Sequence, residues 1–270
     1  MSSRVRRVAV ILGILLAVSA SAATTHPTTS QKDTKQQLIQ KALKCLDKQD
    51  TFAAIEGVAS YQDTLTGASV FDDLMGKLYW DQKNLNAAVA MGRAGVQMAL
   101  TEALRIHSKQ PKLSNKLRNI AWSTSYNVAS FTWPGWSEPG ILVTNTDISI
   151  GLDAARTNLR LTRELKKGAL EVSRANWIIG AQQLASGKKS DAIASFQSGA
   201  AAAVKARSRA DELLNTGFAQ MVELLGSPEN TQMKARLTAT KQALSREKDG
   251  ADFVQQIDTA YRVFANIAVK

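Results

Sequence analysis

The sequence has very few of the side chains on which metal sites and nucleophilic catalysis depend. It contains one cysteine and two histidines among 270 residues. One cysteine excludes an internal disulfide, and Cys45 continues an apolar stripe with Ala42 and Leu46, so we expect a small buried hydrophobic residue there. Neither His26 nor His107 has a partner at a metal-ligand spacing. We therefore expect no structural zinc and no other metal site.

Nucleotide-binding and hydrolase motifs are missing as well. The sequence has no phosphate loop, no dinucleotide-binding fingerprint and no strand-turn-helix nucleophile elbow. Two carboxylates can catalyse glycoside hydrolysis, and Glu138 and Asp147 flank an aromatic segment described below. Asp147 is better explained as part of a helical first turn, where its charge favours the helix dipole. We expect a protein that is not an enzyme and needs no cofactor.

Acidic residues are fewer than basic ones, which leaves a formal net charge of +11. The lysines and arginines are scattered among acids, and the densest basic stretch is the short KARSRA, Lys205 to Ala210. Without a recognition motif, scattered charge of this kind is typical of solvated helix faces. We expect no nucleic-acid partner, while attraction to an anionic surface remains open.

No apolar run is long enough to cross a membrane. Arg4, Arg6 and Arg7 precede the apolar run 8–18, which is shorter than the about 20 residues that a spanning helix needs. The small residues 20–22 follow, and this three-part layout predicts a signal peptide over 1–22, cleaved before Ala23. The alternative is an uncleaved anchor. We expect a secreted or periplasmic protein with no integral span after cleavage, and a polar flexible leader over 23–33.

Strand patterns are almost absent, because the one apolar run of strand character, 141–144, is too short for a sheet. Apolar residues elsewhere recur at three- and four-residue spacings, which predicts helices and an all-α domain over 34–270. The expected helices are 35–48, 51–65, 70–82, 85–107, 113–131, 147–166, 169–186, 190–225, 233–246 and 251–268.

Small residues recur with one spacing in three of these helical pairs. Each pair of small residues is 12 positions apart, and the second pair lies 34 residues beyond the first. Small side chains allow two helix backbones to approach closely in a hairpin, so we expect the closest contacts at these positions. The pairs are Ala42 with Ala54, Gly76 with Ala88, and Gly180 with Ala192.

Two of these hairpins resemble the tetratricopeptide repeat family. Ile179-Gly180 matches the family's Leu-Gly pair, Gly187 its turn glycine, and Ala192 with Phe196 its Ala-x3-Phe. In the earlier hairpin, Gly76, Tyr79 and Ala88 match, and Gly92 stands where the family has an aromatic residue. The resemblance implies an irregular tetratricopeptide-like α-solenoid of helical hairpins with a groove for a protein or peptide. A compact helical bundle is the alternative.

The aromatic loop, residues 132–146, interrupts the helices with two Pro-Gly turn signals. Proline pushes the preceding residue toward extended backbone, so this segment is expected to be non-helical. Its apolar side chains, together with Phe131, Leu142 and their neighbours, predict an ordered insertion packed on the scaffold. Either it covers exposed core as a lid, or it presents a binding platform.

The predicted binding residues are therefore Phe131, Trp133, Trp136 and Glu138. With no catalytic motif in competition, we expect an exported, non-enzymatic helical scaffold that binds a protein or peptide. The alternative is a cell-envelope protein that stacks the Trp-Pro-Gly-Trp loop on a glycan, since aromatic side chains are enriched at binding hot spots.

Overall fold

The computed structural model describes residues 29–267, and the side chains of residues 34–266. The predicted signal peptide, 1–22, and the leader up to residue 28 lie outside the described residues. Helix begins at Thr29, so the last residues of the expected leader already belong to the first described helix.

The predicted all-α fold is confirmed over the described range, where every regular element is helical and consecutive helices pack in pairs, as in an α-solenoid. The elements are α2 (Thr29–Asp47), α3 (Thr51–Ala59), α4 (Thr64–Trp80), α5 (Leu85–Ile106), α6 (Pro111–Phe131), the 3₁₀ helix η1 (Pro134–Trp136), α7 (Asn145–Glu164), α8 (Ala169–Ala185), α9 (Lys189–Lys205), α10 (Arg209–Gly226), α11 (Thr231–Leu244) and α12 (Gly250–Ile267).

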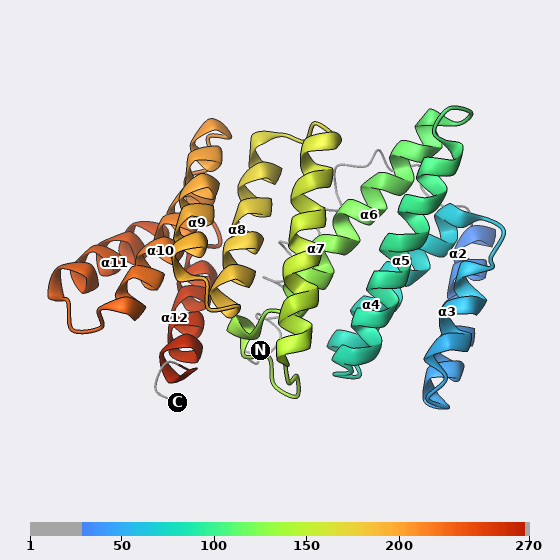
Figure 1. The fold of residues 1–270 in the computed structure, drawn as a ribbon, viewed down its shortest axis with the longest axis horizontal. Coiled ribbons are helices and arrows are strands. Elements are labelled where there is room, and N and C mark those ends of the chain that lie inside the picture. Colours follow the sequence, from blue (N-terminus) through green and yellow to red (C-terminus); the bar gives the residue numbers. More distant parts are fainter. Residues whose placement is uncertain (1–28, 268–270) are drawn as a thin grey trace. The chain divides into compact units, whose positions relative to one another are not determined.

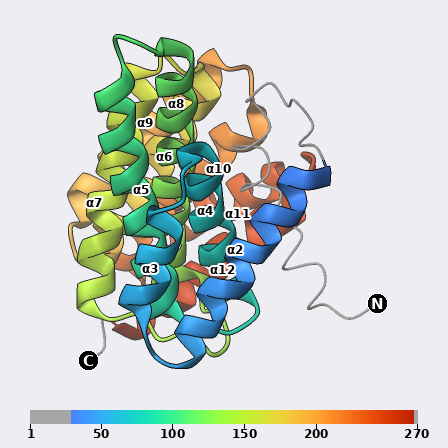
Figure 2. The same ribbon diagram turned by 90° about the vertical axis from the view of Figure 1, so that its right-hand side faces the viewer.

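The chain divides into two compact units between Phe131 and Thr132. In the N-terminal unit, α2 to α6 pack in sequence order, and α2 also contacts α4, which in turn contacts α6. Figure 2 views this unit from the side of α2, which lies beside α3 and α4. In the C-terminal unit, α7 to α11 pack in sequence order, and α12 returns to contact α10 and η1 (Figure 1).

Four of the described turns between helices, those after α2, α7, α8 and α9, share one geometry. A residue with positive φ follows the helix, and the next N–H donates five residues back, as from Lys167 to the Thr162 carbonyl and from Lys188 to Gln183. This is the Schellman arrangement, which satisfies carbonyl groups at a helix end. Gly187 occupies the left-handed position in the α8–α9 turn with φ +76°, and Lys166 does so after α7.

The single helix predicted over 190–225 is wrong. Arg207 adopts φ +56° and separates α9 from α10, although this stretch holds no proline and no glycine between Ala200 and Thr216. Extensive packing of α10 on α9 stabilises the turn against the 1–2 kcal/mol that a left-handed L-residue costs. A capping signal was present: the Ser208 hydroxyl donates to Asp211 Oδ2 at 2.6 Å, in the Ser-x-x-acid spacing of a helix start.

The helix predicted over 51–65 is also too long. It ends at Ala59, and Asp63 begins α4 by accepting the N–H groups of Leu65 and Thr66. An aspartate at this position satisfies backbone donors that have no partner within the helix. The α4 helix therefore starts at Thr64, before the predicted Val70.

Small residues do set the closest helix contacts, though not at every expected position. A Cβ at Gly180 would lie 2.9 Å from Phe196 Cδ1 and 3.1 Å from the Ala192 carbonyl, as expected for the α8–α9 hairpin. Gly76 has no atom within 4 Å of such a Cβ, so the close approach predicted there is wrong. In that unit the tight positions are Gly92, against Val128 and Met75, and Gly95 against Phe71.

Other expected packing positions are buried. Ala42 on α2 and Ala54 on α3 are buried, and Tyr79 and Ala88 also lie in the core of the N-terminal unit. Cys45 is half-buried rather than buried. None of the described helices combines the length and the apolar character that crossing a membrane requires.

Candidate binding pocket beside the aromatic loop

The aromatic loop begins with a turn that its prolines impose. Trp133, which precedes Pro134, has extended backbone (φ −93°, ψ 117°), as the residue before a proline should. Pro134 then starts the single turn of η1, and proline suits a first helical position because its missing N–H would have no helical partner. Ser137 ends this turn with φ +49° and donates its N–H to the Pro134 carbonyl at 3.0 Å.

Trp133 is the centre of the aromatic core of the C-terminal unit. Its side chain is 1% exposed, and its ring meets Trp136 edge to face at 4.8 Å between centroids and Trp177 at 5.5 Å. The rings of Phe218 and Phe264 also pack against Trp133. For Trp133, the lid interpretation is therefore the one that the burial supports.

Gly135 is required by this packing. A Cβ at Gly135 would lie 2.5 Å from both Cε2 and Cη2 of Trp133, well inside the contact distance of two carbon atoms. The absence of a side chain lets the backbone of η1 lie directly on the indole ring. The Pro-Gly signal therefore marks a close approach as well as a turn.

Phe131 and Leu142 do not join Trp133. Phe131 ends α6 and stacks on Tyr79 in the N-terminal unit, with ring centroids 4.0 Å apart and planes 4° apart. Its side chain is 2% exposed, which leaves no surface for a ligand. Leu142 was expected to help bury the loop, but it is 82% exposed. The loop is held by its tryptophans, and its second half lies more open.

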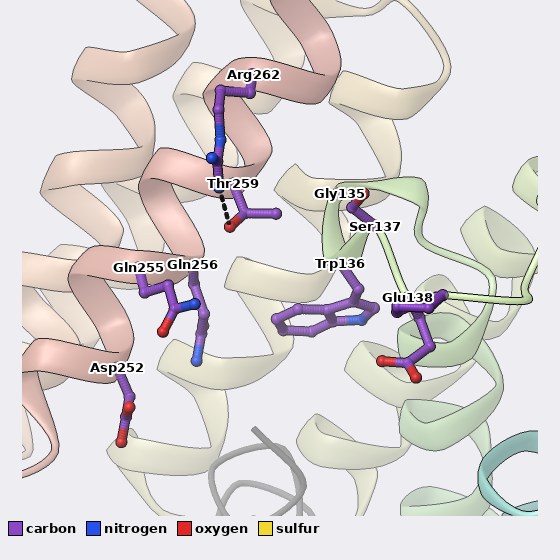
Figure 3. Close-up of a pocket in the computed structure, with 10 residues that line it drawn as sticks. Gly135, Trp136, Ser137, Glu138, Asp252, Gln255, Gln256, Thr259 and Arg262 are labelled. Atoms are coloured by element: carbon purple, nitrogen blue, oxygen red, sulfur yellow. Dashed lines mark hydrogen bonds between the residues drawn. The ribbon is translucent and has the colours of Figure 1, made fainter. Parts of the chain in front are cut away.

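Trp136 and Glu138 are the predicted binding residues that line a pocket. Both are half-buried, and they lie on one wall of a pocket of about 160 Å³ between the aromatic loop and α12 (Figure 3). The loop contributes residues 135–139. The opposite wall is one face of α12, where side chains recur at three- and four-residue spacings: Asp252, Gln255, Gln256, Thr259 and Arg262.

Gln256 is the least satisfied polar side chain of this pocket. The residue is 8% exposed, and among the described residues neither its carboxamide oxygen nor its nitrogen has a hydrogen-bond partner. In Figure 3 the Trp136 ring extends toward it from the opposite wall. Leaving a buried polar group unpaired costs about 1–3 kcal/mol, so a hydrogen-bonding partner at this carboxamide would be stabilising.

The charged side chains of the pocket lie toward opposite ends of the α12 wall. Asp252 stands in the first turn of α12, and Arg262 lies ten residues later, where its Nη2 donates to Thr259 Oγ1 at 3.1 Å. At 1.5 Å per residue, ten helical residues span about 15 Å. No described residue forms an ion pair with Asp252 or with Arg262.

Asp147, the other acid that flanks the aromatic loop, serves as a helix cap. It is 5% exposed, and its Oδ2 accepts the Thr144 N–H at 2.9 Å and the Thr144 hydroxyl at 2.7 Å. Its own N–H donates to Thr144 Oγ1, which completes the capping box at the start of α7. The predicted first-turn position of Asp147 is confirmed, and Asp147 does not line the pocket with Glu138.

A second polar cluster lies in the N-terminal unit. The Asp72 carboxylate on α4 accepts hydrogen bonds from the Thr124 hydroxyl at 3.0 Å and from the Asn127 amide at 3.2 Å, both on α6. Burial raises the pKa of Asp72 above its ordinary value, against the lowering effect of these two donors. The neighbouring Asp73 pairs with Lys35 of α2 at 2.9 Å. This cluster ties three helices together.

The side chains that the structure describes include no group of three or more histidine, cysteine, aspartate or glutamate residues placed to hold a metal ion. Comparison of the chain with protein-family models, with curated proteins and with solved structures found no match. The pocket between the aromatic loop and α12 is therefore the feature on which a proposed function rests.

Sequence reasoning found the loop wall of the pocket and missed the α12 wall. Gln256 is about 120 residues from Trp136 in the chain, and no motif in the sequence of α12 predicts that these two residues line the same pocket. The one available signal was the polar stripe at positions 252, 255, 256, 259 and 262, which lies beside a strongly apolar face of the same helix.

Proposed function

We propose that this protein is an exported, non-enzymatic scaffold, built as a tetratricopeptide-like α-solenoid, that binds a protein or peptide partner through the pocket between the aromatic loop and α12. The observation that supports the proposal is that the half-buried Trp136 and the carboxamide of Gln256, which has no hydrogen-bond partner among the described residues, lie on opposite walls of that pocket. A partner that hydrogen-bonds to Gln256 would offset the cost of its burial.

The aromatic wall supports the same proposal. Tryptophan is enriched at interface hot spots because it contributes a large contact area, and such anchors are most effective in desolvated pockets. Trp133 fixes the position of Trp136 by holding its ring edge to face, so the anchor is preorganised for binding.

A glycan-associated function is the alternative, since a tryptophan beside amide, hydroxyl and carboxylate groups also suits a sugar ring. Stacking on a sugar requires an open aromatic face. Trp136 already packs perpendicular to Trp133 at 4.8 Å between ring centroids and lies tilted against Trp177 at 5.7 Å, which leaves less of its ring free. We therefore place the protein or peptide partner first.

Affinity capture with three forms of the protein tests this function. The wild type, Trp136→Ala and Phe52→Ala are immobilised and exposed to an envelope extract of the source organism. Phe52 is the matched aromatic control, because it is 77% exposed on α3 in the other unit. We expect a defined set of proteins to be retained by the wild type and by Phe52→Ala and lost by Trp136→Ala.

Identical capture by all three forms, while circular dichroism shows each of them folded, would refute a partner site at Trp136. Capture of no protein by the folded wild type would count against the scaffold function as a whole.

A further inference from the structure

We propose that the pocket binds an extended peptide segment of about four to five residues, in a fixed direction. A basic group lies beside Asp252, the N–H and C=O of a central residue pair with Gln256, and an acidic group lies beside Arg262. This inference rests on the proposed function and adds the chemistry and the orientation of the ligand.

The length of the polar stripe on α12 sets the length of the ligand. Asp252 and Arg262 are about 15 Å apart along the helix. Extended chain advances about 3.3 Å per residue, so a segment of four to five residues spans the same distance. A pocket of about 160 Å³ is smaller than the sites that enclose whole small molecules, about 300–1,000 Å³. It suits one inserted side chain, packed on Trp136, within a longer chain that continues past it.

The chemistry of Gln256 favours a peptide unit at the centre. A carboxamide offers one oxygen acceptor and two N–H donors on a rigid plane. Each residue of a peptide carries one N–H donor and one C=O acceptor, and in extended chain these two groups point to the same side. Neither carboxamide atom of Gln256 has a partner among the described residues, and both would be used by the N–H and the C=O of one residue in an extended peptide.

The charges set the direction. Asp252 and Arg262 have opposite sign, have no ion-pair partner among the described residues, and stand at opposite ends of the stripe. Glu138 stands on the loop wall, and in Figure 3 the Trp136 ring lies between it and Asp252, so the direction rests on Asp252 and Arg262. A ligand with its basic and acidic groups in the matching order gains both attractions, whereas the reversed order places like charges together, which opposes binding.

Selection from a random heptapeptide library displayed on phage tests the inference. The library is panned on the immobilised full-length protein. We expect enrichment of a basic residue and an acidic residue four positions apart, with an apolar residue between them. The enriched peptide is then synthesised in three forms: as selected, with its two charged residues exchanged, and with the central peptide N–H replaced by an ester oxygen.

Titration calorimetry should show about tenfold weaker binding of the ester form, and a similar loss when Gln256→Leu binds the selected peptide, because each removes one to two hydrogen bonds. Gln242→Leu is the matched control, since Gln242 is exposed on α11 and does not line the pocket. Its affinity should equal that of the wild type. Thermal unfolding of both variants establishes that they are folded.

Several results would overturn the inference: no enrichment, equal affinity for the charge-exchanged peptide, unchanged affinity of a folded Gln256→Leu variant, or displacement of the peptide by a trimer of N-acetylglucosamine. The last result would assign the pocket to a glycan. The capture experiment is repeated with Gln256→Leu. If the captured partner is lost by Trp136→Ala but kept by Gln256→Leu, the proposed function stands and this inference fails.

Discussion

Replacing Gly135 by alanine should displace the aromatic loop while leaving every polar side chain of the pocket unchanged. The added methyl group would lie 2.5 Å from two carbon atoms of the Trp133 ring, where carbon atoms are in favourable contact at about 3.5–4.0 Å. Either the ring or η1 must therefore move by about 1 Å. The ring has little freedom to move, because Trp136, Trp177 and Phe218 surround it.

Overpacking of this kind costs about 1–3 kcal/mol. For a chain of this size, about 1 kcal/mol corresponds to about 2–4 °C in Tm, so we expect Gly135→Ala to lower Tm by about 2–12 °C. The near-ultraviolet circular dichroism of the coupled Trp133 and Trp136 rings should change as well. The capture and peptide assays should then show weaker binding, because Trp136 shifts with the turn.

Gly76→Ala is the control for this experiment. Gly76 lies inside α4 and has no atom within 4 Å of an added Cβ, so alanine there should stabilise the protein by about 0.5–1 kcal/mol. If Gly135→Ala melts within 1 °C of the wild type and keeps its near-ultraviolet spectrum, the tight contact between η1 and Trp133 is wrong. The positioning of Trp136 by Trp133 would then be wrong with it.

Two further stability measurements follow from the turns and from Asp72. Thermal unfolding should show that Lys166→Gly stabilises and Gly187→Ala destabilises the protein by about 0.5–1 kcal/mol each, because both positions have positive φ; equal effects of the same sign would contradict that geometry. Burial raises the pKa of Asp72, so the native state binds the Asp72 proton more tightly than the unfolded state does. The contribution of this group to the free energy of unfolding therefore falls as the pH rises from the ordinary pKa of 3.8 through the raised pKa. Asp72→Asn keeps an oxygen acceptor for both donors but has no proton to lose. In denaturant titrations, the free energy of unfolding of this variant minus that of the wild type should therefore increase between pH 4 and pH 7. A difference that stays constant with pH would refute the raised pKa.

The sequence predicted the helices well where apolar periodicity was uninterrupted, and less well where a helix ends without glycine or proline. Arg207 and Lys166 show the difficulty, because left-handed backbone at a basic residue has no compositional signature. Tertiary packing of the flanking helices stabilises these turns, and that packing is not visible in a local window. The turn at Gly187, by contrast, was anticipated from its glycine.

The candidate site divides in the same way. Trp136 and Glu138 were predicted because tryptophan and proline in a short loop are unusual beside alanine-rich helices. Gln256 and Arg262 look like ordinary residues on the polar face of an amphipathic helix, and their role depends on α12 folding back against η1. A contact between segments this far apart in the chain is set by the whole unit, so no local pattern could have predicted it.

The lid and the binding platform, which the sequence posed as alternatives, are assigned to different residues of one turn. Trp133 is buried and takes the structural role, while Trp136, three residues later and half-buried, lines the pocket. The edge-to-face contact of the two rings joins these roles, because the buried ring restricts the orientation of the other. A preorganised aromatic side chain loses less conformational entropy on binding than a mobile one. In the proposed binding function, burial of Trp133 is thus a physical reason for Trp136 to be an effective anchor, and the packing of both rings depends on glycine at position 135.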